Sequence, residues 1–345
     1  MDFRHFTAGK DDDGRRLDRI ARKFLDGSAL SSVYKFLRKG LIKVNGKKRS
    51  AEFKVSENDD IEIADFLVSN AGKSGDEEDG GEREGTTLDE RMVLKRTKDI
   101  LLLNKPYDVC VQPSRNSKSE SLSEIVEADF LSRKSARVGD SLSFRTGPLH
   151  RLDRKTTGLI AFSQSLAGAK TFTSLMSAHR IKKTYIGIME GRLEREETWR
   201  DRIEKEDSEQ ENGNGFHKVK VEDEENGCGK ISVTKAAPLF FGKIGDAEAT
   251  VVKFEIETGR THQIRSQSKT HAHPLLGDTA YGSNRRTNLG RDFFLHAYRI
   301  EFDEVDRDEV ERIGLQLAMT APLHDDFKAA LAKLGMEKSV ENLIN

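Results

Sequence analysis

The stretch HRLDRKTTGLI, residues 150–160, places an aspartate between two arginines and close to a histidine. Gly147 and Pro148 precede it, and a glycine follows at position 158, which argues against a continuous helix. The next residues, LIAFS, are typical of a buried strand, so we expect Asp153 in a loop that enters this strand. Loops on a rigid sheet often display reactive side chains. The pattern alone fits either a catalytic carboxylate or a structural aspartate paired with arginine.

The tetrad RLDR also occurs at residues 16–19, in a different setting. The apolar residues here follow the spacing of one face of an amphipathic helix: Leu17, Ile20, Ala21, Phe24 and Leu25. Asp18 points away from this stripe and lies near the helix N-terminus, where a carboxylate suits the helix dipole. We therefore predict that Asp18 is a solvated helix charge and that Asp153 is the candidate for chemistry.

The composition of the whole chain limits the class of protein. The chain has 345 residues, enough for two domains, and its 34% charged residues leave a net charge of only −1. Any basic surface for nucleic acid must therefore be local. Two cysteines, Cys110 and Cys228, are too few for a disulfide framework. No apolar run of about 18 residues and no signal-peptide pattern occur, so we expect a cytoplasmic protein without membrane association.

Two segments rich in glycine and acidic residues divide the chain. Such segments cannot bury enough apolar surface to offset their conformational entropy. The first predicts a flexible acidic linker at 71–90, between an N-terminal domain at 1–70 and a larger domain at 91–345. The second, about 194–229, is flanked by strand-like runs, and we expect a solvated insertion within the larger domain.

The N-terminal domain carries a local positive charge. Between Ser31 and Lys54 there are eight lysines and arginines and one acidic residue. A second helix ends at Gly40, and GLIKVNGKKRSAEFKVSENDDIEI follows with an Asn-Gly turn. Helices and hairpin together resemble the S-four-type RNA-binding domain, a small α/β domain. The resemblance implies contacts to the RNA backbone by six residues: Lys35, Arg38, Lys39, Lys43, Lys47 and Arg49.

Residues 91–330 resemble the RluA-type pseudouridine synthases. HRLDRKTTGL is similar to the family signature, in which the aspartate is catalytic. Six further motifs follow the family order: ILLLNKPYDVCVQP (100–113), KKTYIGIMEG (182–191), ETGRTHQIR (257–265), HPLLGDTAYG (273–282), FFLHAYRIEF (293–302) and APLHDDF (321–327). The resemblance implies an α+β fold: a mixed, largely antiparallel sheet with flanking helices and a central cleft, with Asp153 at its floor.

The resemblance also implies the reaction. A uridine already in RNA loses its glycosidic bond, the base turns, and it is rejoined through carbon. No redox change or phosphoryl transfer occurs, so the reaction requires neither a cofactor nor a metal. The carboxylate can act as nucleophile or as proton acceptor, and both paths stay open.

The family pattern assigns roles to seven residues. Asp153, Tyr185 and Arg265 would be catalytic, with Arg265 keeping the carboxylate ionised and Tyr185 stacking on the uracil. The base must first leave its helix, and Arg151 would fill the space it vacates. Further substrate contacts are implied for His150, Arg260 and His262. Departures from the pattern occur at five positions: Asn104, Tyr107, Asp108, Gln112 and Gln267.

Two rival hypotheses fit parts of the sequence. A metal site is suggested by His262, His271 and His273, but their spacing matches no zinc motif. A non-catalytic RNA-binding factor for ribosome assembly is the second, and the presence of all three catalytic residues argues against it. We therefore predict a monomeric isomerase acting on large-subunit ribosomal RNA or a pre-ribosomal particle, because the domain pair resembles the RluC and RluD branch. Transfer RNA is the alternative substrate.

Overall fold

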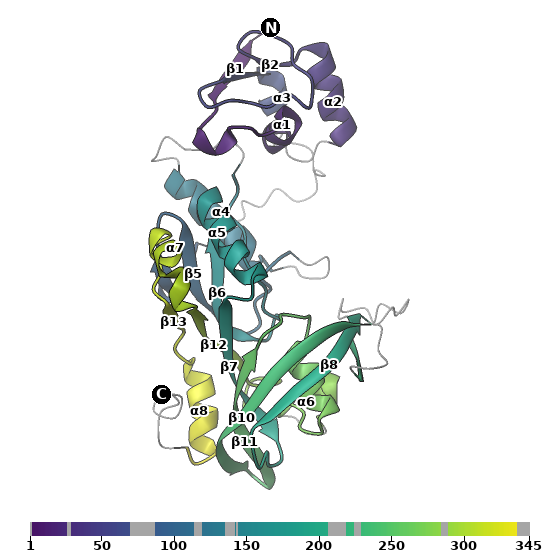
Figure 1. The fold of residues 1–345 in the computed structure, drawn as a ribbon, viewed down its shortest axis with the longest axis vertical. Coiled ribbons are helices and arrows are strands. Elements are labelled where there is room, and N and C mark those ends of the chain that lie inside the picture. The colour runs from purple at the N-terminus through teal and green to yellow at the C-terminus, as the bar shows by residue number, and fades with distance from the viewer. Residues whose placement is uncertain are drawn as a thin grey trace. The chain divides into compact units, whose positions relative to one another are not determined.

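A computed structural model describes residues 2–25, 29–69, 87–113, 119–134, 142, 144–205, 219–223, 229–283 and 289–336. The chain forms two compact units (Figure 1). The smaller comprises Met1–Thr86 with Glu127–Arg145, and the larger comprises Thr87–Val126 with Thr146–Asn345. The linker expected at 71–90 lies mostly outside the described residues, which resume at Thr87. No helix in the described ranges is both long and apolar enough to cross a membrane.

The smaller unit contains a three-stranded antiparallel sheet in the order β1-β3-β2. Its elements are β1 (Phe3–Thr7), η1 (Lys10–Asp12), α1 (Leu17–Phe24), α2 (Leu30–Lys39), β2 (Ile42–Val44), β3 (Asp60–Ala64) and α3 (Asp65–Ser69). Gly40 ends α2 with φ 70°, and the expected turn after β2 has Asn45 and Gly46 at positive φ. The predicted apolar stripe of α1 lies in the core, with Leu17, Ile20 and Ala21 fully buried.

The prediction for Asp18 is wrong. Its side chain is buried, and Arg16 donates two hydrogen bonds to it at 3.2 and 2.7 Å, while the Tyr34 hydroxyl donates a third at 3.2 Å. The Arg16 hydrogen bonds are the main reason that the pKa of Asp18 lies below its usual value. The first turn of α1 is covered by a later segment, because the backbone N–H of Asp18 donates to the Ala51 carbonyl. Asp18 is therefore a structural ion-pair residue.

The larger unit contains a ten-stranded sheet in the order β4-β5-β6-β12-β7-β11-β10-β8-β9, with β13 beside β12. Only β6 and β12 pair in parallel among the described strands, so the predicted mixed, largely antiparallel sheet is confirmed. The strands are β4 (Val93–Arg96), β5 (Ile100–Lys105), β6 (Thr157–Ser163), β7 (Ile181–Glu190), β8 (Glu197–Lys205), β9 (Val219–Asp223), β10 (Lys230–Ile244), β11 (Ala247–Ile256), β12 (Leu295–Phe302) and β13 (Ala318–Thr320).

Helices pack on both faces of this sheet, and its central strand β7 is buried from Thr184 to Met189. The helical elements are η2 (Glu90–Met92), α4 (Leu122–Lys134), α5 (Leu166–Ser177), α6 (Gln263–Thr270), η3 (Thr279–Tyr281), η4 (Glu304–Asp306), α7 (Arg307–Arg312) and α8 (Asp325–Lys333). On β7, Ile186 and Ile188 pack with α8, whereas Tyr185 belongs to the core on the face that α6 covers. This alternation places Tyr185 on the α6 face of the sheet, where it lines a cavity.

The prediction of a solvated insertion at 194–229 is wrong for its first part. Residues 197–205 form β8, which pairs with β10, and Trp199 on β8 is 1% exposed. Along β8 the buried residues Trp199, Asp201 and Ile203 alternate with more exposed charged ones. The many charged residues of this segment masked the alternation of buried and exposed positions that is typical of a strand. Residues 219–223 of the predicted insertion form β9, which pairs with β8, and 206–218 and 224–228 lie outside the described residues.

Candidate active site

Asp153 lies in the loop before β6, as predicted, and this loop is fixed to the sheet at Gly158. Gly158 has φ 105° and pairs with Ala297 on β12. A side chain at this position would meet the Ala297 backbone at 2.3 Å, so only glycine allows β6 and β12 to approach this closely. The Thr156 backbone N–H donates to the Asp153 carbonyl at 3.1 Å and closes the turn. The loop therefore presents Asp153 from the end of a rigid strand pair.

The side chain of Asp153 faces a cavity in the larger unit. The charged and aromatic residues that line the cavity are Arg151, Asp153, Tyr185, Arg260, His262 and Arg265. Of the seven site residues predicted for this unit, only His150 is absent from this lining. The structure thus brings together three motifs that are widely separated in the sequence.

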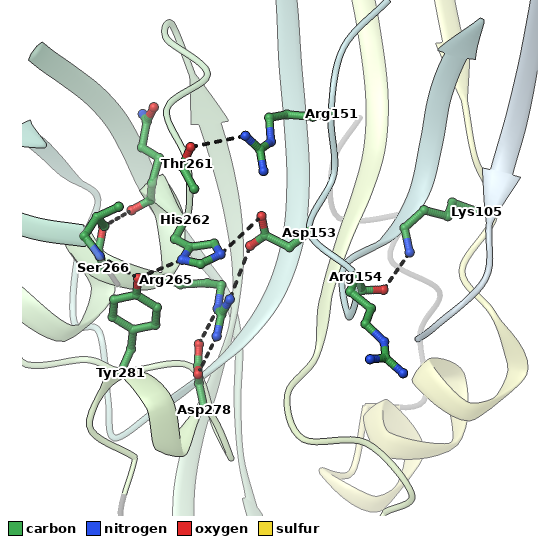
Figure 2. A network of polar contacts seen from close by, with 12 residues as sticks. Lys105, Arg151, Asp153, Arg154, Thr261, His262, Arg265, Ser266, Asp278 and Tyr281 are labelled. Atoms are coloured by element: carbon green, nitrogen blue, oxygen red, sulfur yellow. Dashed lines mark hydrogen bonds and ion pairs between the residues drawn. The ribbon is translucent and has the colours of Figure 1, made fainter. Parts of the chain in front are cut away.

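Arg265 on α6 is the cation closest to Asp153. Its Nη1 lies 3.4 Å from Asp153 Oδ2, and its Nε and Nη2 donate to Asp278 at 2.7 and 2.9 Å (Figure 2). The guanidinium lies between the rings of Tyr281 and Phe293, 4.9 and 4.5 Å from their centroids. Burial lowers the pKa of Arg265, but the Asp278 hydrogen bonds and both carboxylate charges raise it above its usual value. Asp278 therefore fixes one edge of the guanidinium, and the other edge faces Asp153.

His262 is the second basic group near Asp153. It precedes α6 with φ 52°, and its Nε2 lies 3.8 Å from Asp153 Oδ1. Its Nδ1 lies 2.8 Å from the Tyr281 hydroxyl. Burial lowers the pKa of His262, and the opposing effect of Asp153 does not compensate. The imidazole is therefore neutral at physiological pH.

Tyr185 contributes the aromatic wall of the cavity. It lies in the middle of β7, paired with Phe254 on β11 and Ala297 on β12, and it is 8% exposed. Burial, and then the negative charge of Asp153, raise the pKa of its phenol. Tyr185 is thus a protonated phenol beside Asp153, and it can stack on a base or donate a hydrogen bond.

Lys105 supports the Asp153 loop, and it was not among the predicted site residues. Its fully buried Nζ donates to the carbonyls of Pro106, Val109 and Arg154 at 3.0, 2.8 and 2.7 Å (Figure 2). Burial lowers its pKa to about 7, against the effect of Asp153. The sequence signal for this role was the Lys-Pro pair at the end of an apolar strand. A lysine buried there needs hydrogen-bond acceptors, and backbone carbonyls can supply them.

Two arginines lie at the more exposed side of the cavity, and His150 lies apart from it. Arg151 and Arg260 are both exposed, and Arg151 reaches the Thr261 hydroxyl at 3.4 Å. His150 instead accepts the Ala161 backbone N–H at 3.0 Å and stacks on Phe172. Burial lowers its pKa to about 4, so it is neutral. The structure therefore gives His150 a position that supports β6 rather than one facing a substrate.

Gln267, one of the departures from the family pattern, anchors α6 to the sheet. It is fully buried, accepts from the Thr234 hydroxyl at 2.6 Å and donates to Asp201 at 2.6 Å. His271 also contacts Asp201 at 3.0 Å and stacks on Trp199. These contacts hold the helix that carries Arg265 against β8 and β10.

The three clustered histidines that suggested a metal site have separate partners. His262 bonds to Tyr281, His271 contacts Asp201, and His273 Nδ1 lies 3.3 Å from the Glu190 carbonyl. Among the residues described, no three potential ligands are arranged to hold a metal ion.

The basic residues predicted to contact RNA lie in the smaller unit. Lys35, Arg38 and Lys39 are exposed on α2, opposite its buried Val33 and Leu37. Lys47 is exposed in the turn after β2. Lys43 lies over the Phe3 ring at 4.2 Å and Arg49 over the Phe53 ring at 4.6 Å, so these two are partly buried.

Comparisons with known proteins identify the class of enzyme. A family model described as RNA pseudouridylate synthase matches residues 99–270. The ribosomal large subunit pseudouridine synthase C of Pasteurella multocida is 27% identical, covering 96% of this chain and 94% of the relative. Two proteins of the same name match similarly. The one from Haemophilus ducreyi is 28% identical and the match covers 96% of each chain, and the one from Escherichia coli strain K12 is 27% identical and the match covers 94% of each chain.

Two human structures share the fold. RNA Pseudouridylate Synthase Domain Containing 1 has a TM-score of 0.52 at 22% identity, covering 73% of this chain and 92% of its own. RNA Pseudouridylate Synthase Domain Containing 4 has a TM-score of 0.52 at 19% identity, covering 72% of this chain and 94% of its own. Fold, site and relatives define an enzyme that isomerises uridine in RNA. The chain is similar over nearly its whole length to pseudouridine synthases of the large ribosomal subunit, and the family model agrees with that class of enzyme.

Proposed function

We propose that this pseudouridine synthase acts on large-subunit ribosomal RNA, with Asp153 as its catalytic carboxylate. The observation that carries the assignment of Asp153 is the shared arginine. Arg265 is buried and held by Asp278, yet it turns Nη1 toward Asp153 at 3.4 Å inside the cavity. A carboxylate in a partly desolvated site stays ionised only beside such a cation. Asp153 is then available as a nucleophile or a proton acceptor at the ribose.

The remaining cavity residues suit a flipped uridine. The phenol of Tyr185 offers a flat apolar wall on which the uracil stacks, and its proton allows it to donate to the base. Arg151, in the same loop as Asp153, is exposed and able to enter the RNA helix where the base has left. Arg260 supplies a second exposed cation for the neighbouring phosphates.

The smaller unit supplies RNA affinity in this proposal. Its antiparallel sheet and the helices α1 and α2 agree with an S-four-type domain, and α2 carries three exposed basic residues on one side. Phosphate contacts of this kind position an enzyme on RNA without reading sequence. The substrate proposal is supported by relatives that match nearly the whole chain, including this unit, and are named as enzymes of the large ribosomal subunit.

Mapping of pseudouridines in cells that lack the protein tests the substrate. Total RNA from deleted cells, from complemented cells, and from cells complemented with Asp153→Asn would be compared. We expect one or more large-subunit sites to lose the modification and to regain it only with the unmodified enzyme. Loss confined to transfer RNA would overturn the ribosomal assignment and leave the enzyme class intact.

A further inference from the structure

A chain of polar groups runs from β9 to the carboxylate of Asp153. The backbone N–H of Val219 donates to the Tyr281 hydroxyl oxygen at 3.2 Å, and that oxygen lies 2.8 Å from His262 Nδ1. On the other side of the imidazole, Nε2 lies 3.8 Å from Asp153 Oδ1. Figure 2 shows Tyr281, His262 and Asp153 in this order, with the imidazole between the phenol and the carboxylate.

The direction of the hydrogen bond between Tyr281 and His262 follows from its neighbours. A peptide N–H can only donate, so Val219 uses a lone pair of the phenol oxygen and leaves the phenol proton for another acceptor. Burial is the main reason that the pKa of Tyr281 is raised to about 12, so this proton stays in place at neutral pH. His262 is neutral there, because burial lowers its pKa, and one of its nitrogens is therefore an acceptor. Among the described residues, His262 Nδ1 lies 2.8 Å from the phenol oxygen and can accept this proton.

A neutral imidazole that accepts at Nδ1 carries its proton at Nε2, the nitrogen that faces Asp153. We propose that Tyr281 is a positioning residue that holds His262 in this tautomer, so that the imidazole is a hydrogen-bond donor toward Asp153 and the cavity. The other tautomer would turn a lone pair toward the carboxylate, and two electron-rich groups would repel each other. The distance of 3.8 Å between His262 Nε2 and Asp153 Oδ1 is longer than a hydrogen bond, as is common for catalytic contacts in enzymes without bound substrate.

The ring and the hydroxyl of Tyr281 make different contacts. The ring packs on the Arg265 guanidinium at 4.9 Å and edge-on to His262 at 5.6 Å, whereas the hydroxyl takes part in the chain described above. Tyr281→Phe therefore removes the donor to His262 and keeps the ring against Arg265. The tautomer itself is independent of the proposed function, but its effect on turnover rests on the proposed role of Asp153.

The direct test is the nitrogen spectrum of the histidine side chains. Long-range proton–nitrogen NMR on the full chain, labelled with ¹⁵N at its nine histidines, distinguishes protonated from unprotonated ring nitrogens. The His262 signals are assigned by their loss in His262→Gln. At pH 8 we expect the unmodified protein to carry the proton on Nε2, and Tyr281→Phe to show a mixture or the other tautomer. A proton on Nδ1 in the unmodified protein would overturn the proposal whether or not the enzyme is active.

The kinetic test uses the pH dependence of single-turnover rates at saturating RNA. At pH 8, Tyr281→Phe should react about tenfold more slowly, the effect of one hydrogen bond, with RNA affinity unchanged. Below its lowered pKa, His262 becomes imidazolium and both nitrogens carry protons, so the deficit should shrink as the pH falls. The charged groups around His262 are Asp153, Asp278, Arg151 and Arg265, and all four are present in both proteins, so the ratio of the two rates isolates the imidazole.

Two comparisons separate this role from a loss of structure. Tyr107→Phe removes a phenol that also accepts a backbone N–H, from Asp292 at 2.9 Å, but that does not line the cavity. Its rate should match the unmodified enzyme at every pH. In a His262→Gln background, adding Tyr281→Phe should cost less than about twofold more. A deficit of Tyr281→Phe that stays the same at a pH where the nitrogen spectrum shows His262 as imidazolium, or that persists fully without His262, would contradict the proposal.

Discussion

Arg265 faces two carboxylates, and the geometry divides its roles between them. Asp278 takes Nε and Nη2 in a two-pronged pair, so the guanidinium cannot rotate. Nη1 is then left toward Asp153 at a longer distance. A cation held in this way stabilises the ionised form of Asp153 by its charge and does not need to move during the reaction.

Arg265→Met should therefore impair turnover more than RNA binding. Two buried or partly buried carboxylates would lose their cation, and Asp153 would take up a proton more easily. We expect the single-turnover rate to fall by at least about a hundredfold near neutral pH, the range for loss of one electrostatic contact to the reacting groups. Part of the rate should return as the pH rises and the carboxylate ionises again. A rate profile parallel to that of the unmodified enzyme would show that Arg260 or another cation holds Asp153.

At the residue scale, short motifs predicted which side chains meet in the cavity. Asp153, Tyr185 and Arg265 stand in such motifs, and the fold brings all three to one cavity. Asp278 and Tyr281 could not be assigned in this way, because their roles depend on partners from other segments. Asp18 was misjudged for the same reason, since residues 51–53 cover a helix face that looks exposed when α1 is considered alone.

At the scale of elements, strand types were predictable and strand neighbours were not. The apolar run at β6 and the strand-like runs on either side of residues 194–229, which correspond to β7 and β10, were expected, but nothing local shows that β12 lies between β6 and β7. The strand β8 was missed because its charged outward residues dominate its composition. Its inward residues alternate, and that period was a usable signal.

The end of β5 ties the sheet to the Asp153 loop through Lys105, and this tie should show in the pH dependence of stability. Burial lowers the Lys105 pKa to about 7, whereas the ordinary pKa of a lysine, which an unfolded chain retains, is 10.5. Between these values the unfolded chain binds more protons, so this residue makes stability rise with pH from about 7 to 10.5. In Lys105→Met the rise should be smaller. Denaturant unfolding of both proteins from about pH 6.5 to 10 measures the difference.

The same substitution should also reduce turnover, because the Arg154 carbonyl, one residue beyond Asp153, loses its donor. Lys170→Met, on the exposed side of α5, is the control and should leave both stability and rate unchanged. If Lys105→Met had the same pH dependence of stability as the unmodified chain, Lys105 would not titrate in this window.

At the scale of the whole molecule, we propose that RNA affinity and chemistry belong to different units of the chain. The cavity lies wholly in the larger unit, whereas the exposed basic face of α2 lies in the smaller one. The net charge of −1 hid this local concentration of charge, which the count of basic residues along residues 31–54 revealed. The arrangement predicts that affinity and rate can be altered separately.

Replacing Lys35, Arg38 and Lys39 by glutamine in the full chain should weaken RNA binding and flatten its salt dependence. Binding releases fewer counterions when phosphate contacts are lost. Each lost contact should therefore reduce the slope of log binding constant against log salt concentration by about 0.7 to 0.9. At saturating RNA the single-turnover rate should stay within about threefold, because the cavity is intact. The matched control replaces Lys170, Arg312 and Lys333. These residues are exposed on α5, α7 and α8, which cover the face of the large sheet opposite the cavity. Equal slopes for the two triple variants would mean that α2 does not contact RNA.

The central claim is that Asp153 performs the chemistry, and the full-length Asp153→Asn variant tests it most directly. Asparagine keeps the size of the side chain and removes its charge and most of its nucleophilicity. In a tritium-release assay on unmodified ribosomal RNA, we expect turnover to fall below detection while RNA affinity stays within about twofold. Asp18→Asn, in the other copy of the tetrad, should keep a normal maximal rate. Normal tritium release by Asp153→Asn would contradict the account.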